Sequence, residues 1–326
     1  MISPSRRFKE NYRSILESAI EAVKPEFLLK KNVNISGETL KIRDEIFDLS
    51  KFEKIYVIGI GKGAPSLCDG LIDIFGEKIE KGIIISGENF KPGSEKISSF
   101  KGDHPFPGDN STHAAEELKN FIRNINEKDL VITLLTGGSS AMIISPPEGI
   151  GLKDISEINS LLIRSGASIH EINCIRKHLS TIKGGLLAKM IHPARIISLI
   201  ISDVTGSDPG VIGSGPFYGD PSTFQDAVDI LRKYSLIQKV GKTITDHLKK
   251  GAAGDIDDTP EPDDPTFINN RSYIIGENIN ALNAAKERAE ELGLNSEILR
   301  SDEQGDVRSA SKRYGELIRK RVSNNT

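Results

Sequence analysis

The sequence predicts an α/β fold, in which a mostly parallel sheet carries helices on both faces. The first observation is the order of elements, because segments that look like buried strands alternate with segments of helical periodicity. The second is that three predicted strands run into loops rich in Gly, Ser and Asp, at residues 59–63, 136–140 and 202–216. Ligands of such folds bind outside the carboxyl ends of the strands, so these loops form the candidate site.

Six short segments have the composition of strands. Most are rich in isoleucine, valine or leucine and are bounded by charged or turn-forming residues, as buried strands of a parallel sheet are. In chain order, the predicted strands are residues 54–58, 82–86, 129–135, 195–201, 272–276 and 295–299.

Apolar residues at helical spacing predict the helices between these strands. In the clearest case, apolar residues from Ile172 to Leu186 are spaced 3, 4, 3 and 4 apart, which predicts a single helix over 171–190. Ser111 and Thr112 can cap an earlier helix. In chain order, the predicted helices are residues 67–75, 111–125, 152–167, 171–190, 224–234, 280–292 and 307–321.

Composition excludes several classes of protein. Lys plus Arg number 43 and Asp plus Glu number 46, so the net charge of −3 argues against a general nucleic-acid binder or a polybasic membrane-surface protein. No apolar run approaches the roughly 18 residues of a membrane span, and the N-terminus has no signal-peptide pattern. Cys68 and Cys174 form no CxxC motif, which excludes a cysteine-based zinc site and favours a reducing, cytoplasmic location.

The chain length suggests more than one domain. We expect residues 1–240 to form the large α/β domain. Residues 241–270 are predicted as a linker, because 255–265 hold six acids and three prolines. The β-α-β-α pattern of 271–326 predicts the start of a second, incomplete α/β domain.

The first candidate loop is Gly59-Ile60-Gly61-Lys62-Gly63-Ala64, between a strand and a helix. Its glycines let the backbone approach a ligand, the helix N-terminus favours an anion, and Lys62 adds a positive charge. Two alternatives remain open. The loop also satisfies the dinucleotide pattern G-x-G-x-x-A, with Glu88 after the next strand, and it could be a plain strand–helix turn.

The second loop and the helix after it add further polar groups. Gly137, Gly138, Ser139 and Ser140 offer backbone N–H groups and hydroxyls suited to an anion. In the segment 171–185, the polar residues lie off the apolar stripe, and helical spacing brings several within reach of one another. These residues are Asn173, Arg176, Lys177, Ser180 and Lys183. The alternative is a solvated basic helix face.

The third loop places Asp203 and Asp208 just past a strand, and Ser214-Gly215-Pro216 continues it. Carboxylates at such a position commonly meet Mg²⁺ bound to phosphates, although the same residue types also favour turns. His104 stands alone in a proline-bracketed turn and receives no proton-transfer role.

Taken in order, these segments resemble the glycerate 2-kinase family, whose second domain is known as MOFRL and some of whose members are labelled hydroxypyruvate reductase. The resemblance covers about residues 50–225. The matching motifs are, in chain order, Gly59-x-Gly61-Lys62, Gly102-Asp103-His104-Pro105, Gly137-Gly138-Ser139-Ser140-Ala141, Arg176-Lys177-His178-Leu179-Ser180 with Lys183-Gly184-Gly185, Ser202-Asp203-Val204 with Asp208-Pro209, Ser214-Gly215-Pro216 and Asp220-Pro221-Ser222-Thr223.

The resemblance implies a Rossmann-like first domain and transfer of the ATP γ-phosphate to the 2-hydroxyl of D-glycerate, with Mg²⁺. The partners it implies are glycerate and a nucleotide, and a homodimer is left open. Lys62 and Arg176 are then the catalytic candidates, and Asp203 and Asp208 the Mg²⁺ candidates. The substrate- or phosphate-binding candidates are Gly61, Gly137, Gly138, Ser139, Ser140, Lys177, Asn173, Ser214 and Gly215.

The chain departs from the family pattern in two places. The second loop reads Thr-Gly-Gly-Ser-Ser where the family usually has another Gly before a single Ser, and the family's C-terminal Gly/Arg-rich signature does not occur before Thr326. A truncated chain is therefore expected. Two other functions stay open: an NAD(P)-dependent reductase of a small 2-oxo acid, and a non-catalytic truncated binding protein.

Overall fold

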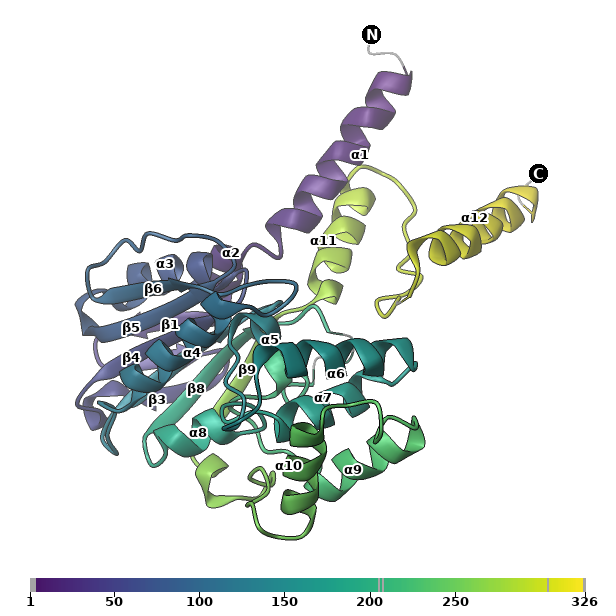
Figure 1. The fold of residues 1–326 in the computed structure, drawn as a ribbon. Coiled ribbons are helices and arrows are strands. Elements are labelled where there is room, and N and C mark those ends of the chain that lie inside the picture. The colour runs from purple at the N-terminus through teal and green to yellow at the C-terminus, as the bar shows by residue number, and fades with distance from the viewer. Residues whose placement is uncertain (1–3, 205, 207, 304, 325–326) are drawn as a thin grey trace. The chain divides into compact units, whose positions relative to one another are not determined.

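The computed structural model of the chain describes residues 4–204, 206, 208–303 and 305–324 (Figure 1). These residues divide into two compact units. The larger runs from Val23 to Glu277 and contains all three loops of the candidate site. The smaller contains the helices α1 (Pro4–Glu21), α11 (Asn278–Glu291) and α12 (Val307–Asn324).

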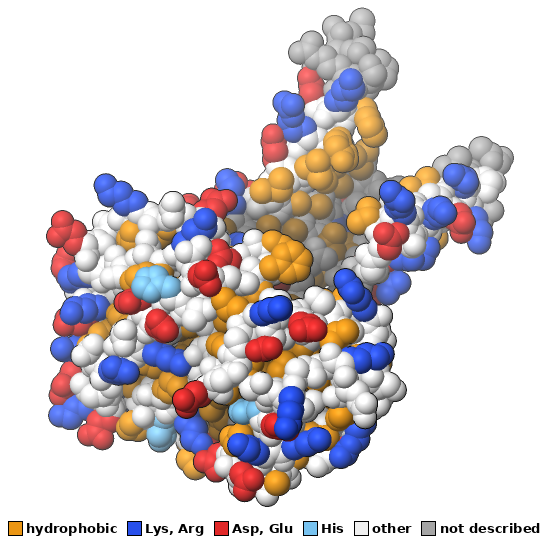
Figure 2. All heavy atoms as spheres, in the orientation of Figure 1, with side chains coloured by type: hydrophobic (Ala, Val, Ile, Leu, Met, Phe, Trp, Pro, Cys, Tyr) orange, Lys and Arg blue, Asp and Glu red, His pale blue; other side chains and the backbone are white. Residues whose placement is uncertain are grey.

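Within the smaller unit, α1 lies against α11. Arg288 Nε donates a hydrogen bond to Ser14 Oγ at 2.8 Å, and Ser18 Oγ donates to the carbonyl oxygen of Ala284 at 3.3 Å. Another face of α1 carries exposed apolar side chains, which Figure 2 shows gathered along the helix and which include Phe8 and Tyr12. None of the described helices is long and apolar enough to cross a bilayer.

A six-stranded parallel sheet forms the centre of the larger unit (Figure 1). Its strands lie in the order β6-β5-β4-β7-β8-β9, so the direction of succession reverses between β4 and β7. This is the Rossmann order, and it confirms the predicted α/β class. In the same order the strands are Ile97–Lys101, Ile79–Ser86, Ile55–Ile60, Leu130–Leu135, Arg195–Ile201 and Arg271–Gly276.

Helices cover both faces of this sheet because its strands are apolar on both sides. Every residue of β4 and β7 is buried, and neighbours such as Val57 and Ile58 pack into opposite core clusters. One face is covered by α2 (Pro25–Asn32) and α3 (Ala64–Phe75). The other is covered by α4 (Asp109–Ile122), α5 (Ser139–Met142) and α8 (Leu186–Ile191).

Four more helices pack around a third apolar cluster of their own, which includes Ile158, Ile175, Leu231 and Leu248. The four-helix group lies beyond the carboxyl end of the sheet's middle strands in Figure 1. Helix α7 reaches the candidate site through Asn173, which accepts a hydrogen bond from Ser214. The helices are α6 (Leu152–Arg164), α7 (Ile169–His178), α9 (Phe224–Lys233) and α10 (Lys242–Ala252).

Several short elements were not predicted. They are the antiparallel strands β1 (Val33–Ser36), β2 (Thr39–Ile42) and β3 (Glu45–Asp48), the edge strand β6, and the 3-10 helices η1 (Leu49–Lys51), η2 (Gly76–Lys78), η3 (Ile212–Ser214) and η4 (Pro265–Phe267). The three antiparallel strands bury Leu40, Ile42 and Phe47 against the α2–α3 core. Strands of only four residues are too short to show a clear period in the sequence.

The single helix predicted over 171–190 is wrong. Helix α7 ends at His178, and α8 begins only at Leu186. Between them Gly184 and Gly185 have φ angles of 58° and 82°, and Gly185 N donates to the carbonyl oxygen of Gly215 at 2.7 Å. The apolar stripe continues through this break because the loop is buried too. The earlier helix α4 also differs from its prediction, since its cap is Gly108 rather than Ser111 or Thr112.

The C-terminal prediction also needs correction. Residues 295–299 form no strand, and β9, assigned by the sequence to the second domain, pairs with β8 in the large sheet. The predicted linker 241–270 contains α10 and η4. Within it, Asp258 accepts a hydrogen bond from Phe224 N at 2.8 Å, so the acidic segment is held on the helical group.

Candidate functional site

The three candidate loops meet because β4, β7 and β8 are neighbours and parallel. The first two flank the point where the strand order reverses, which is the usual ligand site of this fold. They also contact each other: Lys62 N donates to the carbonyl oxygen of Gly137 at 3.0 Å, and Gly63 N donates to Thr136 Oγ1 at 2.9 Å. A side chain on Gly61 would collide with the Thr136 backbone, so this contact requires glycine.

Lys62, His104 and Asp203 gather beside the second loop. The carboxylate of Asp203 lies against Gly137, and a Cβ on Gly138 would lie 2.9 Å from His104 Cδ2. Partial burial and the charge of Lys62 lower the pKa of His104, while Asp203 opposes them. Lys62 and Asp203 are both exposed, so a ligand can reach them. Thr205 and Ser207 of the third loop lie outside the described residues.

A hydrogen-bonded chain links the second loop, the third loop and α7. Ser214 Oγ donates to Asn173 Oδ1 at 3.0 Å, and Ser214 Oγ lies 2.8 Å from Ser140 Oγ. The carbonyl oxygen of Ser140 accepts from Lys183 Nζ at 2.8 Å. Ser214 is fully buried with a φ of 62°, a backbone conformation unusual for serine. Its neighbour Gly213 lies against Ser139. The structure therefore brings most of the predicted binding residues together.

A cavity of about 390 Å³ opens beside this chain. Ser140, Ser180, Arg176, Lys183 and His104 contribute its polar wall, and isoleucines of α6 and the loop before it contribute much of its apolar wall. None of the described residues that line it is an Asp or a Glu. We call this space the cationic cavity.

Of the two strong cations of the cationic cavity, Lys183 is buried and Arg176 is half-buried. Lys183 is 3% exposed, and burial together with the charge of Arg176 lowers the pKa of Lys183 to about 7. Burial also lowers the pKa of Arg176, whose Nε donates to Asn159 Oδ1 at 2.8 Å. The alternative of a solvated basic helix face is therefore wrong for these residues.

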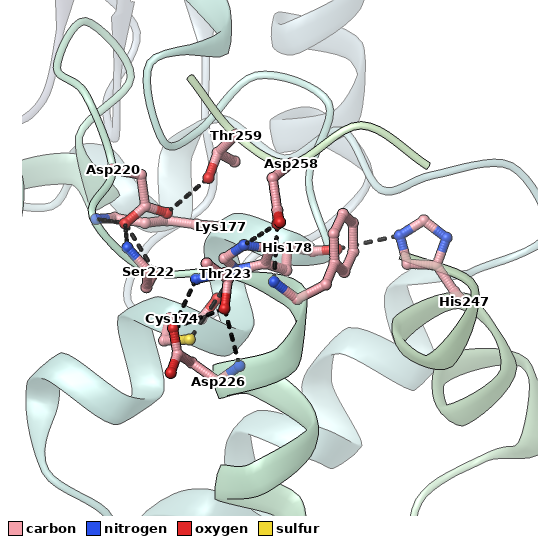
Figure 3. A network of polar contacts seen from close by, with 11 residues as sticks. Cys174, Lys177, His178, Asp220, Ser222, Thr223, Asp226, His247, Asp258 and Thr259 are labelled. Atoms are coloured by element: carbon pink, nitrogen blue, oxygen red, sulfur yellow. Dashed lines mark hydrogen bonds and ion pairs between the residues drawn. The ribbon is translucent and has the colours of Figure 1, made fainter. Parts of the chain in front are cut away.

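Lys177 lies elsewhere, although it follows Arg176 directly in the sequence. Its Nζ lies 3.0 Å from Asp220 Oδ1, in a pair of which both side chains are buried. Asp220 also accepts hydrogen bonds from Ser222 and Thr259. Figure 3 shows this network holding α7, the segment before α9 and the acidic segment together. Lys177 lines a second cavity, of about 640 Å³, not the cationic cavity.

Asp208 and Gly215 also lie apart from the cationic cavity. Asp208 lines the larger cavity, and its Oδ1 accepts a hydrogen bond from Gly210 N at 2.8 Å, which is a local turn contact. Gly215 has a φ of 62° and binds the backbone of Gly185, so it supports the loop. Among the described residues, no group of three or more His, Cys, Asp or Glu could hold a metal by itself.

Lys183 lines the cavity but is absent from the site that the sequence predicts. A signal exists in the sequence, because this lysine directly precedes Gly184-Gly185 and lies off the apolar stripe. Its burial could not be inferred, since the helical prediction continued past it. His104, which had no assigned role, also lines the cationic cavity.

Comparisons with known proteins identify the family of the chain. A family model described as "Domain of unknown function (DUF4147)" matches residues 11–249. The chain is 33% identical over 304 residues to a glycerate 2-kinase of Pyrococcus horikoshii, covering 93% of this chain and 67% of that protein. It is 30% identical over 306 residues to a D-glycerate 2-kinase of Thermotoga maritima, covering 94% and 67%.

A solved structure agrees as well. The crystal structure of a Thermotoga maritima glycerate kinase superposes with a TM-score of 0.75 at 29% identity, over 90% of this chain and 64% of that one. This chain thus spans about two thirds of the length of the relatives described here. The family expected from the ordered motifs is confirmed. The chain belongs to the glycerate 2-kinase family.

Proposed function

We propose that this chain is a glycerate 2-kinase, which transfers the γ-phosphate of ATP to the 2-hydroxyl of D-glycerate. The observation that carries the proposal is the position of Lys62 and the Gly137–Ser140 loop beside a cavity that Arg176 and the buried Lys183 line and whose described lining residues include no Asp or Glu. The names of the relatives support it, since two are called glycerate 2-kinase or D-glycerate 2-kinase.

Each part of this arrangement suits phosphoryl transfer, which depends on positioning and charge stabilisation more than on covalent chemistry. Backbone N–H groups of the 137–140 loop would hold phosphate oxygens, and the exposed ammonium group of Lys62 would neutralise charge on the transferred group. Arg176 would orient the acceptor from the opposite side. The Ser140 hydroxyl belongs to the 137–140 loop and lines the cavity, so it can bond either substrate.

Mg²⁺ is part of the proposal. It usually keeps several waters and binds one or two carboxylates together with substrate phosphates, so a dedicated cage is not required. Asp203 fits this chemistry, because its exposed carboxylate lies against Gly137 of the phosphate-binding loop. Asp208 fits less well, since its carboxylate is engaged at Gly210 in the other cavity. Bound Mg²⁺ would neutralise charge on the ATP phosphates.

A coupled assay of ADP release with D-glycerate, ATP and Mg²⁺ tests the function. We expect ADP only when the hydroxy acid is present. Absence of ADP formation with every small hydroxy acid tried would overturn the kinase assignment. Titration with NADH, followed by nicotinamide fluorescence, tests the reductase alternative, and we expect no binding because Lys62 occupies the turn that would receive a dinucleotide.

A further inference from the structure

Two cationic side chains, the buried Lys183 and the half-buried Arg176, face the cationic cavity without a negative partner among the described residues. Lys183 Nζ has one hydrogen bond, to the carbonyl oxygen of Ser140, and Arg176 donates to the amide oxygen of Asn159. Both acceptors are neutral. No Asp or Glu is among the described residues that line the cavity, and the charge of Arg176 acts against that of Lys183. Buried charges are normally paired, so this arrangement is unfavourable while the cavity lacks an anion.

Lys177, in the same segment, is a buried lysine whose charge is paired with a carboxylate. It is buried like Lys183, but Asp220 pairs with it at 3.0 Å. Its charge is therefore balanced by the protein itself. Among the described residues, Lys177 and Lys183 are thus two buried lysines six positions apart, and of the two it is Lys183, facing the cationic cavity, that has no carboxylate partner. The difference indicates that the partner of Lys183 is a ligand.

The walls of the cavity indicate which anion binds. Ile144, Ile155 and Ile158 are among the apolar residues that line the cavity, so only part of its wall carries charge. A small hydroxy acid matches this, because it has one carboxylate and hydroxyls that Ser140 and Ser180 can bond. A nucleotide triphosphate spreads several charges along its length and would place some of them against isoleucine.

We propose that Arg176 and Lys183 together bind the carboxylate of the acceptor in the cationic cavity, and that Lys183 thereby selects anionic acceptors over neutral polyols. This rests on the proposed function, because it assigns the acceptor end of the same site. The other end of the acceptor then extends past Ser140 toward Lys62 and the phosphate-binding loop. Lys183 is in this account a specificity residue for the kinase reaction.

The test is isothermal titration calorimetry of the full chain with D-glycerate, glycerol and ADP as separate probes. The variants are Lys183→Met and Arg176→Gln, and Lys189→Met is the matched control, since Lys189 is an exposed lysine of the next helix. We expect each cavity variant to weaken D-glycerate binding at least about tenfold, as loss of a charge-assisted hydrogen bond does. ADP affinity should change less than threefold, and glycerol should not bind.

Urea unfolding of every variant shows whether it is folded, and Lys183→Arg, which keeps the charge, should restore part of the affinity. Unchanged D-glycerate affinity in both cavity variants would overturn the carboxylate site, even if ADP is formed. A loss of ADP affinity without a loss of D-glycerate affinity would overturn it in favour of a phosphate site. D-glycerate binding that depends on Lys183, in a protein that forms no ADP, would support the site while rejecting the kinase function.

Discussion

Lys177 and Lys183 show how much the surroundings of a residue decide its chemistry. Both are buried lysines in the same short segment, yet one pairs with Asp220 and the other faces a cavity. The sequence shows only two lysines of equal charge. Their different surroundings follow from their places in the fold, because Lys177 lies in α7 and Lys183 lies in the loop after this helix ends at His178.

The lowered pKa of Lys183 leads to a prediction about pH. In the free protein this pKa is about 7, so the lysine loses its charge as the pH rises above 7, and an anion binds the charged form. D-glycerate affinity should therefore fall roughly tenfold per pH unit above 7, approaching a plateau set by Arg176. His104, also in the cavity, has a pKa that burial and the charge of Lys62 lower from its usual value.

Calorimetry between pH 6.5 and 8.5 measures this dependence. In Lys183→Arg the charge persists, so the affinity should be almost independent of pH over the same range. An equally steep dependence in Lys183→Arg would show that another group titrates, and the assignment to Lys183 would then be rejected.

Removal of one partner of the Lys177–Asp220 pair should destabilise the protein strongly. Asp220→Asn leaves the buried Lys177 ammonium group without a carboxylate, and such a change costs about 3–5 kcal/mol. Urea unfolding gives the free energy. The double variant Lys177→Met/Asp220→Asn removes both charges and should lose less than the sum of the two single changes. Strict additivity would show that the pair is not coupled.

Lys62 is expected to act in turnover rather than in folding. Its side chain is exposed, and only its backbone contacts the second loop, so Lys62→Ala should keep the fold. We expect kcat to fall by at least about tenfold, since a group that stabilises charge in the transition state contributes that much or more. Steady-state kinetics measures it, with Lys81→Ala on the exposed side of β5 as control. Unchanged kinetics would make Lys62 a turn residue only.

At the scale of elements, the break between α7 and α8 shapes the site. Gly185 has a φ of 82°, and a Cβ there would lie 2.8 Å from Phe267 Cζ and 2.9 Å from the carbonyl oxygen of Tyr218. Glycine is therefore required at position 185 for two reasons, the positive φ angle and the lack of room for a Cβ atom. The break lets Gly184 N and Gly185 N donate to the carbonyl oxygens of Ser214 and Gly215, and the adjacent Lys183 reaches the carbonyl oxygen of Ser140.

Alanine substitution separates these two requirements. Gly166→Ala, at a φ of 77° with open space around it, should cost about 1–2 kcal/mol from backbone strain alone. Gly185→Ala adds the collisions and should cost at least about 1 kcal/mol more. Urea unfolding compares them. Equal costs would mean that the contacts of Gly185 adjust freely.

The meeting of the three loops is also a consequence of how the strands are arranged, not of any single residue. Each loop by itself could be an ordinary turn, and each contains residue types that favour turns. Adjacent parallel strands bring the loops to one edge of the sheet, where Lys62, Gly137 and Asp203 become neighbours. The position of the three loops at one edge of the sheet therefore indicates a functional site more strongly than any single motif does.

At the scale of the whole molecule, the limits of the larger unit depend on β9. Strand β9 pairs with β8 over Arg271–Gly276 and buries Tyr273 and Ile275 in the α2–α3 core. A boundary at residue 240 or 270 would remove this strand from the sheet. The segment 241–270 crosses the helical group before it, held through α10 and Asp258.

Two shortened chains test this limit. We expect residues 23–277 to unfold cooperatively, because the compact unit is retained, and residues 23–270 to lose cooperativity or aggregate, because the edge of β8 and apolar core surface become exposed. Circular dichroism during urea unfolding measures both. Equal cooperativity in the two chains would place the boundary before β9, as the sequence pattern suggested.

The sequence by itself determined the α/β class, most strands and helices, the three loops and the family, because these depend on local periodicity, turn chemistry and the order of motifs. Only the tertiary structure decided which charges are compensated. Arg176 and Lys177 are adjacent, and Lys183 follows shortly after, but Asp220 comes from a distant segment and reaches only Lys177. Electrostatic pairing depends on distance and burial in space, and no local pattern of the sequence contains either.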